Sequence, residues 1–277
     1  MKIDVEELKK IVGEDNVSDT VADLYVYSSD ASVHQAAPAV VVKPKTIEEV
    51  QKIMRYANRN KIPVVPRGAG SGTSGHTVPI DGGIVLDLKR MNRILEIRPE
   101  DMLVKVEPGV VDDDLNRALK PYGLFYPPAP ASSRIATIGG EIGANASGIR
   151  SVKYGATRDY VLGLKVVLAN GDLVNLGSNT RVHSAGYQLE RLMVGSEGTL
   201  GVIVEATLRI VPLPKFRCLA VAKFNKREDA GNAISDIISS GAQPSMLELM
   251  DKIGIIAVNK AMNLGLPEVE AIILFEA

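Results

Sequence analysis

Residues 63–75 read Pro63-Val64-Val65-Pro66-Arg67-Gly68-Ala69-Gly70-Ser71-Gly72-Thr73-Ser74-Gly75. An apolar strand here leads into a segment in which four of the last eight residues are glycine. Such a backbone turns sharply, adopts positive φ and brings several N–H groups to one point, an arrangement that suits a phosphate. Taken alone, the stretch is equally typical of a flexible surface loop.

The glycine spacing fits GxGxxG, but the surroundings do not fit a Rossmann dinucleotide site. That motif must open directly into a helix. Here Pro79, Gly82 and Gly83 break any helix, and a second apolar strand follows at 84–88. The loop is therefore expected to join one strand to another, and the P-loop pattern GxxxxGK(S/T) is absent.

Two further stretches are rich in small residues. Residues 137–148 carry glycine at 139, 140, 143 and 148, which indicates a close approach of backbone to something flat or charged, or else tight helix packing. The third stretch reads Val194-Gly195-Ser196-Glu197-Gly198-Thr199-Leu200-Gly201-Val202-Ile203.

In this order the three stretches resemble the FAD-binding domain of the vanillyl-alcohol oxidase/PCMH superfamily, and within it the glycolate oxidase flavin subunit and the FAD-dependent D-lactate dehydrogenases. The resemblance runs from about Tyr27 to the last residue. It implies an α+β fold, with a PCMH-type FAD-binding domain of two α+β subdomains followed by the start of a ferredoxin-like α+β cap domain.

The pattern along the chain divides it into three parts. We expect an N-terminal helix and lead-in over 1–36, the FAD-binding domain over 37–214, and a partial cap domain over 215–277, with the boundary at Pro212-Leu213-Pro214. The chain stops in or just after a strand, which indicates a partial chain or one piece of a split enzyme.

Local signals predict the individual elements. Residues 21–37 have little periodicity and are expected to form a loop, 39–65 a strand–helix–strand unit, and Asn170-Gly171 the turn of a hairpin. Residues beyond 214 alternate strand and helix as β-α-β-α-β. Three acids at 112–114 suit the start of a helix better than a metal site, because consecutive helical residues point in different directions.

The resemblance implies roles for particular residues. The glycine loop would hold the pyrophosphate, with the Ser71 and Thr73 hydroxyls as additional donors. A second group would lie along the isoalloxazine and ribityl parts, and a third would reach the adenosine end. The residues implied are Arg67, Gly68, Ala69, Gly70, Ser71, Gly72 and Thr73 in the loop, Pro130, Ser132, Thr137, Gly139, Gly140, Asn145 and Gly148 in the second group, and Glu197, Gly198, Gly201 and Ile203 in the third.

Some of these assignments leave alternatives open. Arg67 either screens the phosphates or braces the end of its strand, and Glu197 either accepts from ribose hydroxyls or is a plain surface acid. Some relatives attach FAD through a loop histidine, but Ser71 stands at the matching position, so non-covalent FAD is expected. His76 is expected to be a local hydrogen-bonding residue.

Composition excludes several other classes of function. The formal net charge of −1 gives no excess of positive charge to attract nucleic acid. With 4% aromatic residues, the chain also has few side chains on which bases could stack. One cysteine and three scattered histidines make a metal site built from this chain alone improbable. No apolar run is long enough to cross a bilayer and Met1–Asp4 lacks a signal-peptide layout, so a cytoplasmic location is expected.

The resemblance implies an FAD-dependent 2-hydroxyacid dehydrogenase or oxidase of glycolate or D-lactate type, which passes electrons from substrate to a second acceptor. The family's catalytic and metal-ligating histidines have no counterpart in these residues, so no catalytic residue is assigned. The implied partners are a small 2-hydroxyacid and either a second subunit supplying the missing half or an electron-acceptor protein. The alternatives are an FAD-carrying electron-transfer subunit with its substrate site on a partner chain, and a non-redox relative such as an alkylglycerone-phosphate synthase.

Overall fold

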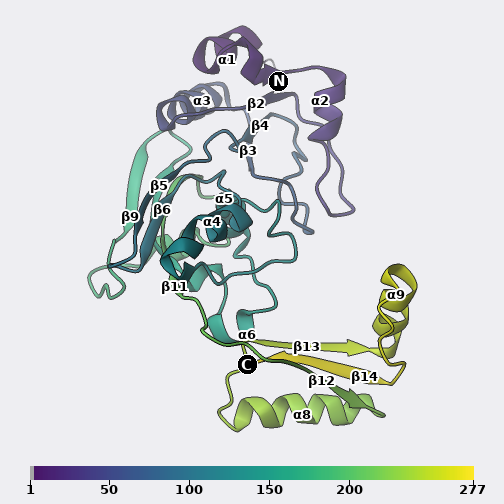
Figure 1. Ribbon diagram of the computed structural model, residues 1–277. Helices are drawn as coiled ribbons and strands as arrows, with labels where there is room; N and C mark the ends of the chain where they lie inside the picture. Colours follow the sequence, from purple (N-terminus) through teal and green to yellow (C-terminus); the bar gives the residue numbers. More distant parts are fainter. Residues whose placement is uncertain (1–2) are drawn as a thin grey trace. The chain divides into compact units, whose positions relative to one another are not determined.

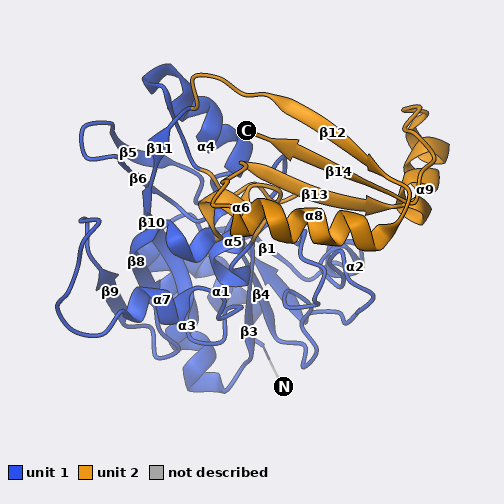
Figure 2. Cartoon of the chain, turned by 90° about the horizontal axis from the view of Figure 1, so that it is seen from below, with its two compact units in different colours: residues 1–126, 132–146, 157–213 blue, residues 127–131, 147–156, 214–277 orange. Residues whose placement is uncertain are grey.

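The computed structural model describes residues 3–277; Met1 and Lys2, which begin the stretch examined for a signal peptide, lie outside the described residues. The chain forms two compact units (Figure 2). Unit 1 holds the described residues up to 126, together with 132–146 and 157–213. Unit 2 holds 127–131, 147–156 and 214–277.

The first half of unit 1 is a four-stranded sheet with helices on both faces (Figure 1). The strand order is β1-β2-β4-β3, in which β2, β4 and β3 are parallel and β1 is antiparallel. Its elements are α1 (Val5–Val12), β1 (Val17–Ser18), α2 (Val21–Val26), β2 (Val40–Val42), α3 (Ile47–Asn60), β3 (Val64–Arg67) and β4 (Ile84–Asp87), with a 3-10 turn at Glu14–Asn16.

Strand alternation decides which helix covers which face of this sheet. Val40 and Val42 face α1 and α3 and share their core with Leu8 and Ile53. Val41 faces the other way, toward Leu24 of α2 and Tyr27. Helix α3 forms because Val50, Ile53, Met54 and Ala57 recur at helical spacing behind the cap residue Thr46.

The second half of unit 1 is a five-stranded antiparallel sheet in the order β5-β6-β10-β8-β9. Val167 of β8 and Val202 and Val204 of β10 belong to the same apolar core as the first sheet. The elements are β5 (Ile94–Arg98), β6 (Leu103–Val106), α4 (Asp112–Leu119), β7 (Leu124–Phe125), α5 (Ile138–Ala144), β8 (Val161–Val167), β9 (Leu173–Gly177), α7 (Leu189–Met193), β10 (Val202–Arg209) and β11 (Val211–Pro212), with 3-10 turns at Lys120–Tyr122 and Thr157–Asp159.

Unit 2 is built on a three-stranded antiparallel sheet in the order β12-β14-β13. Ala230 on α8 packs against Ala271 and Ile273 of the central strand. Its elements are α6 (Ser151–Tyr154), β12 (Leu219–Phe224), α8 (Arg227–Ser239), β13 (Met246–Asp251), α9 (Lys252–Met262) and β14 (Ala271–Glu276). The predicted alternation of strand and helix beyond 214 is therefore confirmed.

One local prediction is wrong. Residues 21–26 form helix α2, capped by Thr20, in a stretch expected to be a loop. Val21 and Val26 are 85% and 65% exposed, so apolar residues on the solvent side of the helix hide its periodicity.

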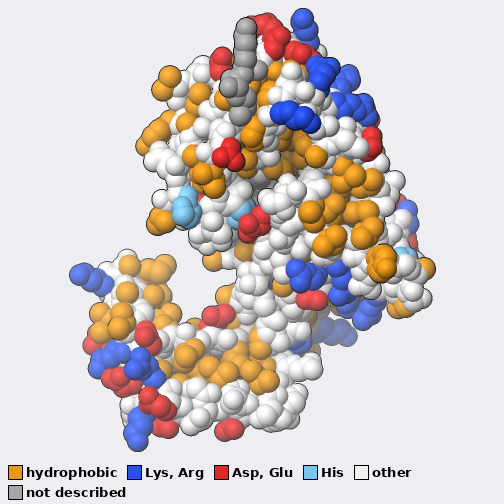
Figure 3. All heavy atoms as spheres, turned by 180° about the vertical axis from the view of Figure 1, so that it is seen from behind, with side chains coloured by type: hydrophobic (Ala, Val, Ile, Leu, Met, Phe, Trp, Pro, Cys, Tyr) orange, Lys and Arg blue, Asp and Glu red, His pale blue; other side chains and the backbone are white. Residues whose placement is uncertain are grey.

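Side chains of both signs of charge lie on the face that Figure 3 shows. Among residues 3–277, no helix is long and apolar enough to cross a membrane.

Candidate functional site

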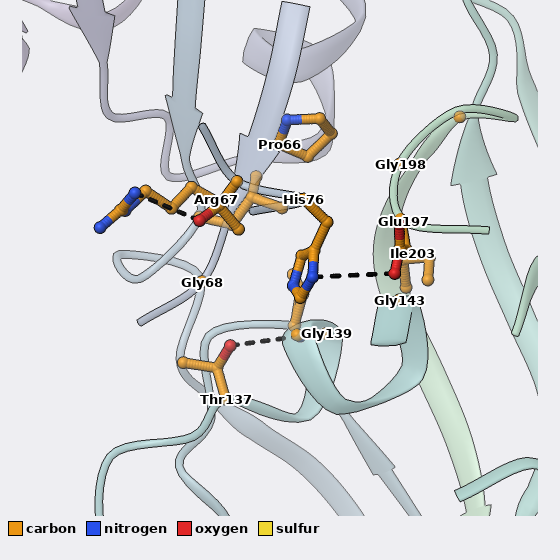
Figure 4. A pocket seen from close by; sticks show the side chains of 15 residues that line it. Pro66, Arg67, Gly68, His76, Thr137, Gly139, Gly143, Glu197, Gly198 and Ile203 are labelled. Atoms are coloured by element: carbon orange, nitrogen blue, oxygen red, sulfur yellow. Dashed lines mark hydrogen bonds and ion pairs between the residues drawn. The ribbon is translucent and has the colours of Figure 1, made fainter. Parts of the chain in front are cut away.

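The three glycine-rich stretches meet around one pocket in unit 1 (Figure 4). The first stretch and the residues just after it supply Pro66, Arg67, Gly68, His76 and Thr77. The second supplies Thr137, Gly139, Gly140 and Gly143, and the third supplies Glu197, Gly198, Gly201 and Ile203, with Leu88 and Pro108 completing the wall. Segments about sixty residues apart in sequence thus share a single groove.

The glycine loop joins two neighbouring parallel strands, β3 and β4, as its sequence predicts. None of the backbone N–H groups of residues 68–73 donates a hydrogen bond to another described residue. The chain turns through a left-handed conformation at Gly70, where φ is +69°. Free amides on a turning backbone form the kind of concavity that binds an anion, so this loop fits a phosphate group.

The loop packs closely against the first turn of helix α5 at Gly68. A Cβ on Gly68 would lie 2.2 Å from Oγ1 of Thr137 and 3.7 Å from Cα of Gly140. Thr137 is the cap of α5, and its Oγ1 accepts the N–H of Gly140 at 3.3 Å. Glycine at 68 is therefore required by the close approach of the loop backbone to the Thr137 hydroxyl.

The third stretch is fixed to the other end of α5. The N–H of Gly195 donates to the carbonyl of Ile142 at 2.9 Å, and the N–H of Glu197 donates to that of Gly143 at 3.0 Å. These bonds satisfy carbonyls that a helix leaves without partners at its C-terminus. The amides at 195 and 197 are consequently engaged within the protein, unlike those of the glycine loop.

Arg67 is positioned as a brace. Its side chain is buried and donates to the carbonyl of Ser29 at 2.8 Å and to Oγ1 of Thr77 at 3.3 Å, while the guanidinium carbon lies 5.4 Å from the ring centre of Tyr27. In Figure 4 it points away from His76. Burial lowers the pKa of Arg67. Of the two roles that the sequence leaves open, these contacts favour bracing the strand and loop over screening phosphates.

Several residues implied by the resemblance do not line this pocket. Ala69, Gly70, Ser71, Gly72 and Thr73 form the remainder of the loop. Ser132 closes a turn, because its carbonyl accepts the N–H groups of Ile135 and Ala136. Asn145 ends α5 at φ +48°, and its side-chain oxygen accepts the N–H of Arg158.

Pro130 and Gly148 belong to unit 2, where they take part in a tight backbone contact. A Cβ on Gly148 would lie 1.8 Å from the carbonyl oxygen of Ala129 and 2.9 Å from the nitrogen of Pro130. This contact alone explains glycine at 148, so a role toward a cofactor for these two residues stays a prediction.

Five wall residues have no assigned role in the sequence analysis: Pro66, Thr77, Leu88, Pro108 and Gly143. His76, expected to be a local hydrogen-bonding residue, also lies in the wall, and its Nδ1 has no hydrogen-bond partner among the described residues. Gly143 could have been found, because it lies four residues after Gly139 and so shares its helix face. Leu88 is the last residue of the strand predicted at 84–88, and Pro108 lies just beyond β6, but nothing local shows that these two strand ends meet at one groove.

Helix α5 also carries a buried acid. Glu141 is 2% exposed, and neither of its carboxylate oxygens has a hydrogen-bond partner in the described part of the chain. Burial, reinforced by the neighbouring charges of Asp112 and Asp113, raises the pKa of Glu141 well above its ordinary value. The side chain is therefore held toward its neutral form.

Comparison with known families shows to which family the chain belongs. Residues 38–177 match the family described as FAD binding domain, and residues 213–277 match FAD linked oxidases, C-terminal domain. The chain is 42% identical over 273 residues to the glycolate oxidase subunit GlcD of Bacillus subtilis, covering 98% of this chain and 58% of that protein. It is also 42% identical to the mitochondrial D-lactate dehydrogenase [cytochrome] of Arabidopsis thaliana, covering 95% of this chain and 47% of the other. The chain thus spans about half the length of these relatives.

Solved structures show the same fold. An alkyldihydroxyacetonephosphate synthase superposes with a TM-score of 0.84 at 23% identity, over 98% of this chain and 55% of that one. A p-cresol methylhydroxylase superposes with a TM-score of 0.82 at 21% identity, over 99% and 59%. The predicted α+β fold is confirmed, and the chain belongs to the PCMH-type FAD-binding family, with FAD as its cofactor.

Proposed function

We propose that this chain is the FAD-binding portion of a 2-hydroxyacid dehydrogenase or oxidase that acts on glycolate, D-lactate or a similar small acid. The observation that carries the proposal is the single groove made by three separated stretches, in a chain 42% identical to a glycolate oxidase subunit and to a D-lactate dehydrogenase. The likeness to the alkyldihydroxyacetonephosphate synthase, at 23% identity, supports the fold and not that activity.

The groove and the glycine loop beside it would hold different parts of FAD with different residues. The free amides of residues 68–73 would hold the pyrophosphate, Thr137, Gly139 and Gly140 would lie beside the ribityl and ring portion, and Glu197 to Ile203 would receive the adenosine end. The flavin, when bound, supplies the acceptor for a hydride from the substrate carbon. We assign no catalytic base to these residues.

The volume open to the centres of water-sized molecules in this pocket is about 50 Å³, so the pocket is narrow. We expect side chains in its wall to move when a dinucleotide binds. The backbones of the loop and of α5 are held by the contacts above, so we expect the movement at side chains such as His76 and Glu197, which lie across the groove (Figure 4).

The experiment is a titration of purified protein with FAD, followed by anaerobic addition of D-lactate or glycolate. Saturable uptake of FAD and loss of its oxidised visible absorbance on addition of one of these acids would support the proposal. Uptake of FAD without reduction by either acid would favour an electron-transfer subunit whose substrate site lies on a partner chain. A protein that takes up no FAD would refute both.

Gly143→Ala tests the path of the cofactor. Gly143 lines the pocket, and a Cβ added there would meet no protein atom within 4 Å. Alanine in place of a helical glycine should stabilise the protein by roughly 0.5–1 kcal/mol. The same methyl should weaken FAD binding about tenfold, because it would occupy space beside the groove. Thermal unfolding without FAD and FAD titration measure the two effects.

Gly231→Ala in α8 is the matched control, since Gly231 also has open space around its Cα and lies in unit 2. It should reproduce the gain in stability and leave FAD affinity unchanged. Equal FAD affinity in Gly143→Ala and the wild type would show that the cofactor does not pass this face of α5.

A further inference from the structure

His76 lies in the wall of the groove with a polar atom that nothing satisfies. Its side chain is 13% exposed, and Figure 4 shows the ring between the β3 end and α5 with one nitrogen toward Glu197. That nitrogen, Nδ1, is buried and hydrogen-bonds to no described residue, and it lies 3.8 Å from Oε1 of Glu197. This separation exceeds hydrogen-bonding distance. A nearby carboxylate favours the tautomer with the hydrogen on Nδ1, which makes this atom a donor without an acceptor.

The imidazole of His76 packs directly against the glycine loop. A Cβ on Gly72 would lie 2.2 Å from Cε1 of His76 and 2.7 Å from Nε2. Gly72 is not among the residues with positive φ, so its backbone conformation does not itself require glycine. The imidazole is what excludes a side chain at position 72.

Glu197 is held beside this donor by an unfavourable backbone conformation. Its φ is +52°, between Gly195 at +83° and Gly198 at +78°. A non-glycine residue in this region is strained, and such strain concentrates at ligand-binding sites. Its carboxylate makes no hydrogen bond with a described residue, and its N–H is fixed to Gly143, so the acceptor is presented next to Nδ1.

We propose that His76 is a cofactor-contacting residue whose Nδ1–H donates to the ribose–pyrophosphate part of FAD while Glu197 accepts from a ribose hydroxyl. The inference rests on the proposed binding of FAD in this groove. A buried donor without an acceptor, His76 Nδ1, lies beside the exposed carboxylate of Glu197, which makes no hydrogen bond with a described residue. This pair is complementary to a phosphate oxygen, which accepts, and to a ribose hydroxyl, which can both donate and accept. The flat apolar faces of the flavin ring offer neither group along most of their area.

The test measures affinity of the flavin-free protein for FAD and for ADP, which carries the ribose and pyrophosphate without the flavin. His76→Ala should weaken both by about 10- to 100-fold, as expected for a hydrogen bond to a charged group. His76→Asn places an amide donor near the position of Nδ1 and should stay within about threefold of the wild type.

Two further variants distinguish a direct contact between His76 and FAD from an indirect effect of His76 on the structure of the loop. His34 is exposed and packs against Gly75 of the same loop, with its Cδ2 2.6 Å from where a Cβ would lie, but it does not line the groove. His34→Ala should leave both affinities unchanged. Gly72→Ala should displace the imidazole, so it should weaken binding more in the wild type than in the His76→Ala background.

The outcomes distinguish this inference from the proposal on which it rests. If the wild type takes up no FAD, both fall. If the wild type binds FAD and His76→Ala binds it as tightly or more tightly, the ring is at most an obstacle in the groove and this inference alone falls.

Discussion

Replacing Gly68 by alanine is expected to weaken FAD binding by about 10- to 100-fold, the equivalent of roughly 1–3 kcal/mol of overpacking. The new Cβ would lie 2.2 Å from Oγ1 of Thr137. Thr137 cannot easily yield, because its side chain is β-branched and caps helix α5. The loop and the helix must therefore separate, and the groove between them changes shape. Fluorescence titration with FAD measures the loss.

The collision itself is tested by a second change. Thr137→Ala removes the atom that the new methyl meets, so the double variant Gly68→Ala/Thr137→Ala should recover part of the affinity lost in Gly68→Ala. Thr137→Ala alone should lower stability by about 1 kcal/mol, the usual cost of losing a helix cap. A double variant that binds FAD more weakly than Gly68→Ala would contradict the steric explanation.

Glu141→Gln is expected to stabilise the flavin-free protein at pH 8 by about 1–2 kcal/mol, as measured by urea denaturation. The native fold raises the pKa of Glu141 through burial and the nearby acids. Below the pKa of the unfolded chain both states hold the proton and no penalty exists. As pH rises from that value toward the folded pKa, the unfolded state loses its proton first, and the folded state loses stability relative to it.

The stabilising effect of Glu141→Gln should therefore grow between about pH 4.5 and neutral pH and vanish at lower pH. Glu205→Gln is the matched control, because Glu205 is also buried but is paired with Lys165 at 2.9 Å. It should destabilise the protein at pH 8. If Glu141→Gln destabilises it as well, Glu141 has a partner in solution that the described residues do not show.

The sequence predicts the parts of the site that depend on local chemistry. Pro79, Gly82 and Gly83 exclude a helix after the glycine loop, and the loop does run from β3 to β4. The turn at Asn170-Gly171 joins β8 to β9 as expected. These predictions succeed because turn residues constrain their own backbone whatever the rest of the chain does.

Other features depend on contacts between distant residues, which the sequence does not show. Glycine at 68 and at 72 looks alike in the sequence, yet one is required by Thr137 and the other by His76. From the sequence alone, Arg67 could either screen the phosphates or brace its strand. Its hydrogen bond to the carbonyl of Ser29, which favours bracing, is visible only in the structure. The burial of Glu141 within a glycine-rich helix has no local signal at all.

The end of helix α5, where Gly195 and Glu197 donate to Ile142 and Gly143, has a consequence for how the holoprotein is made. These bonds join the third stretch to helix α5 through amides and carbonyls of the polypeptide itself. Because they fix the main chain on this side of the groove, we expect binding of FAD to cost little further main-chain ordering entropy there. Flavin-free protein should therefore be able to take up FAD after it has folded.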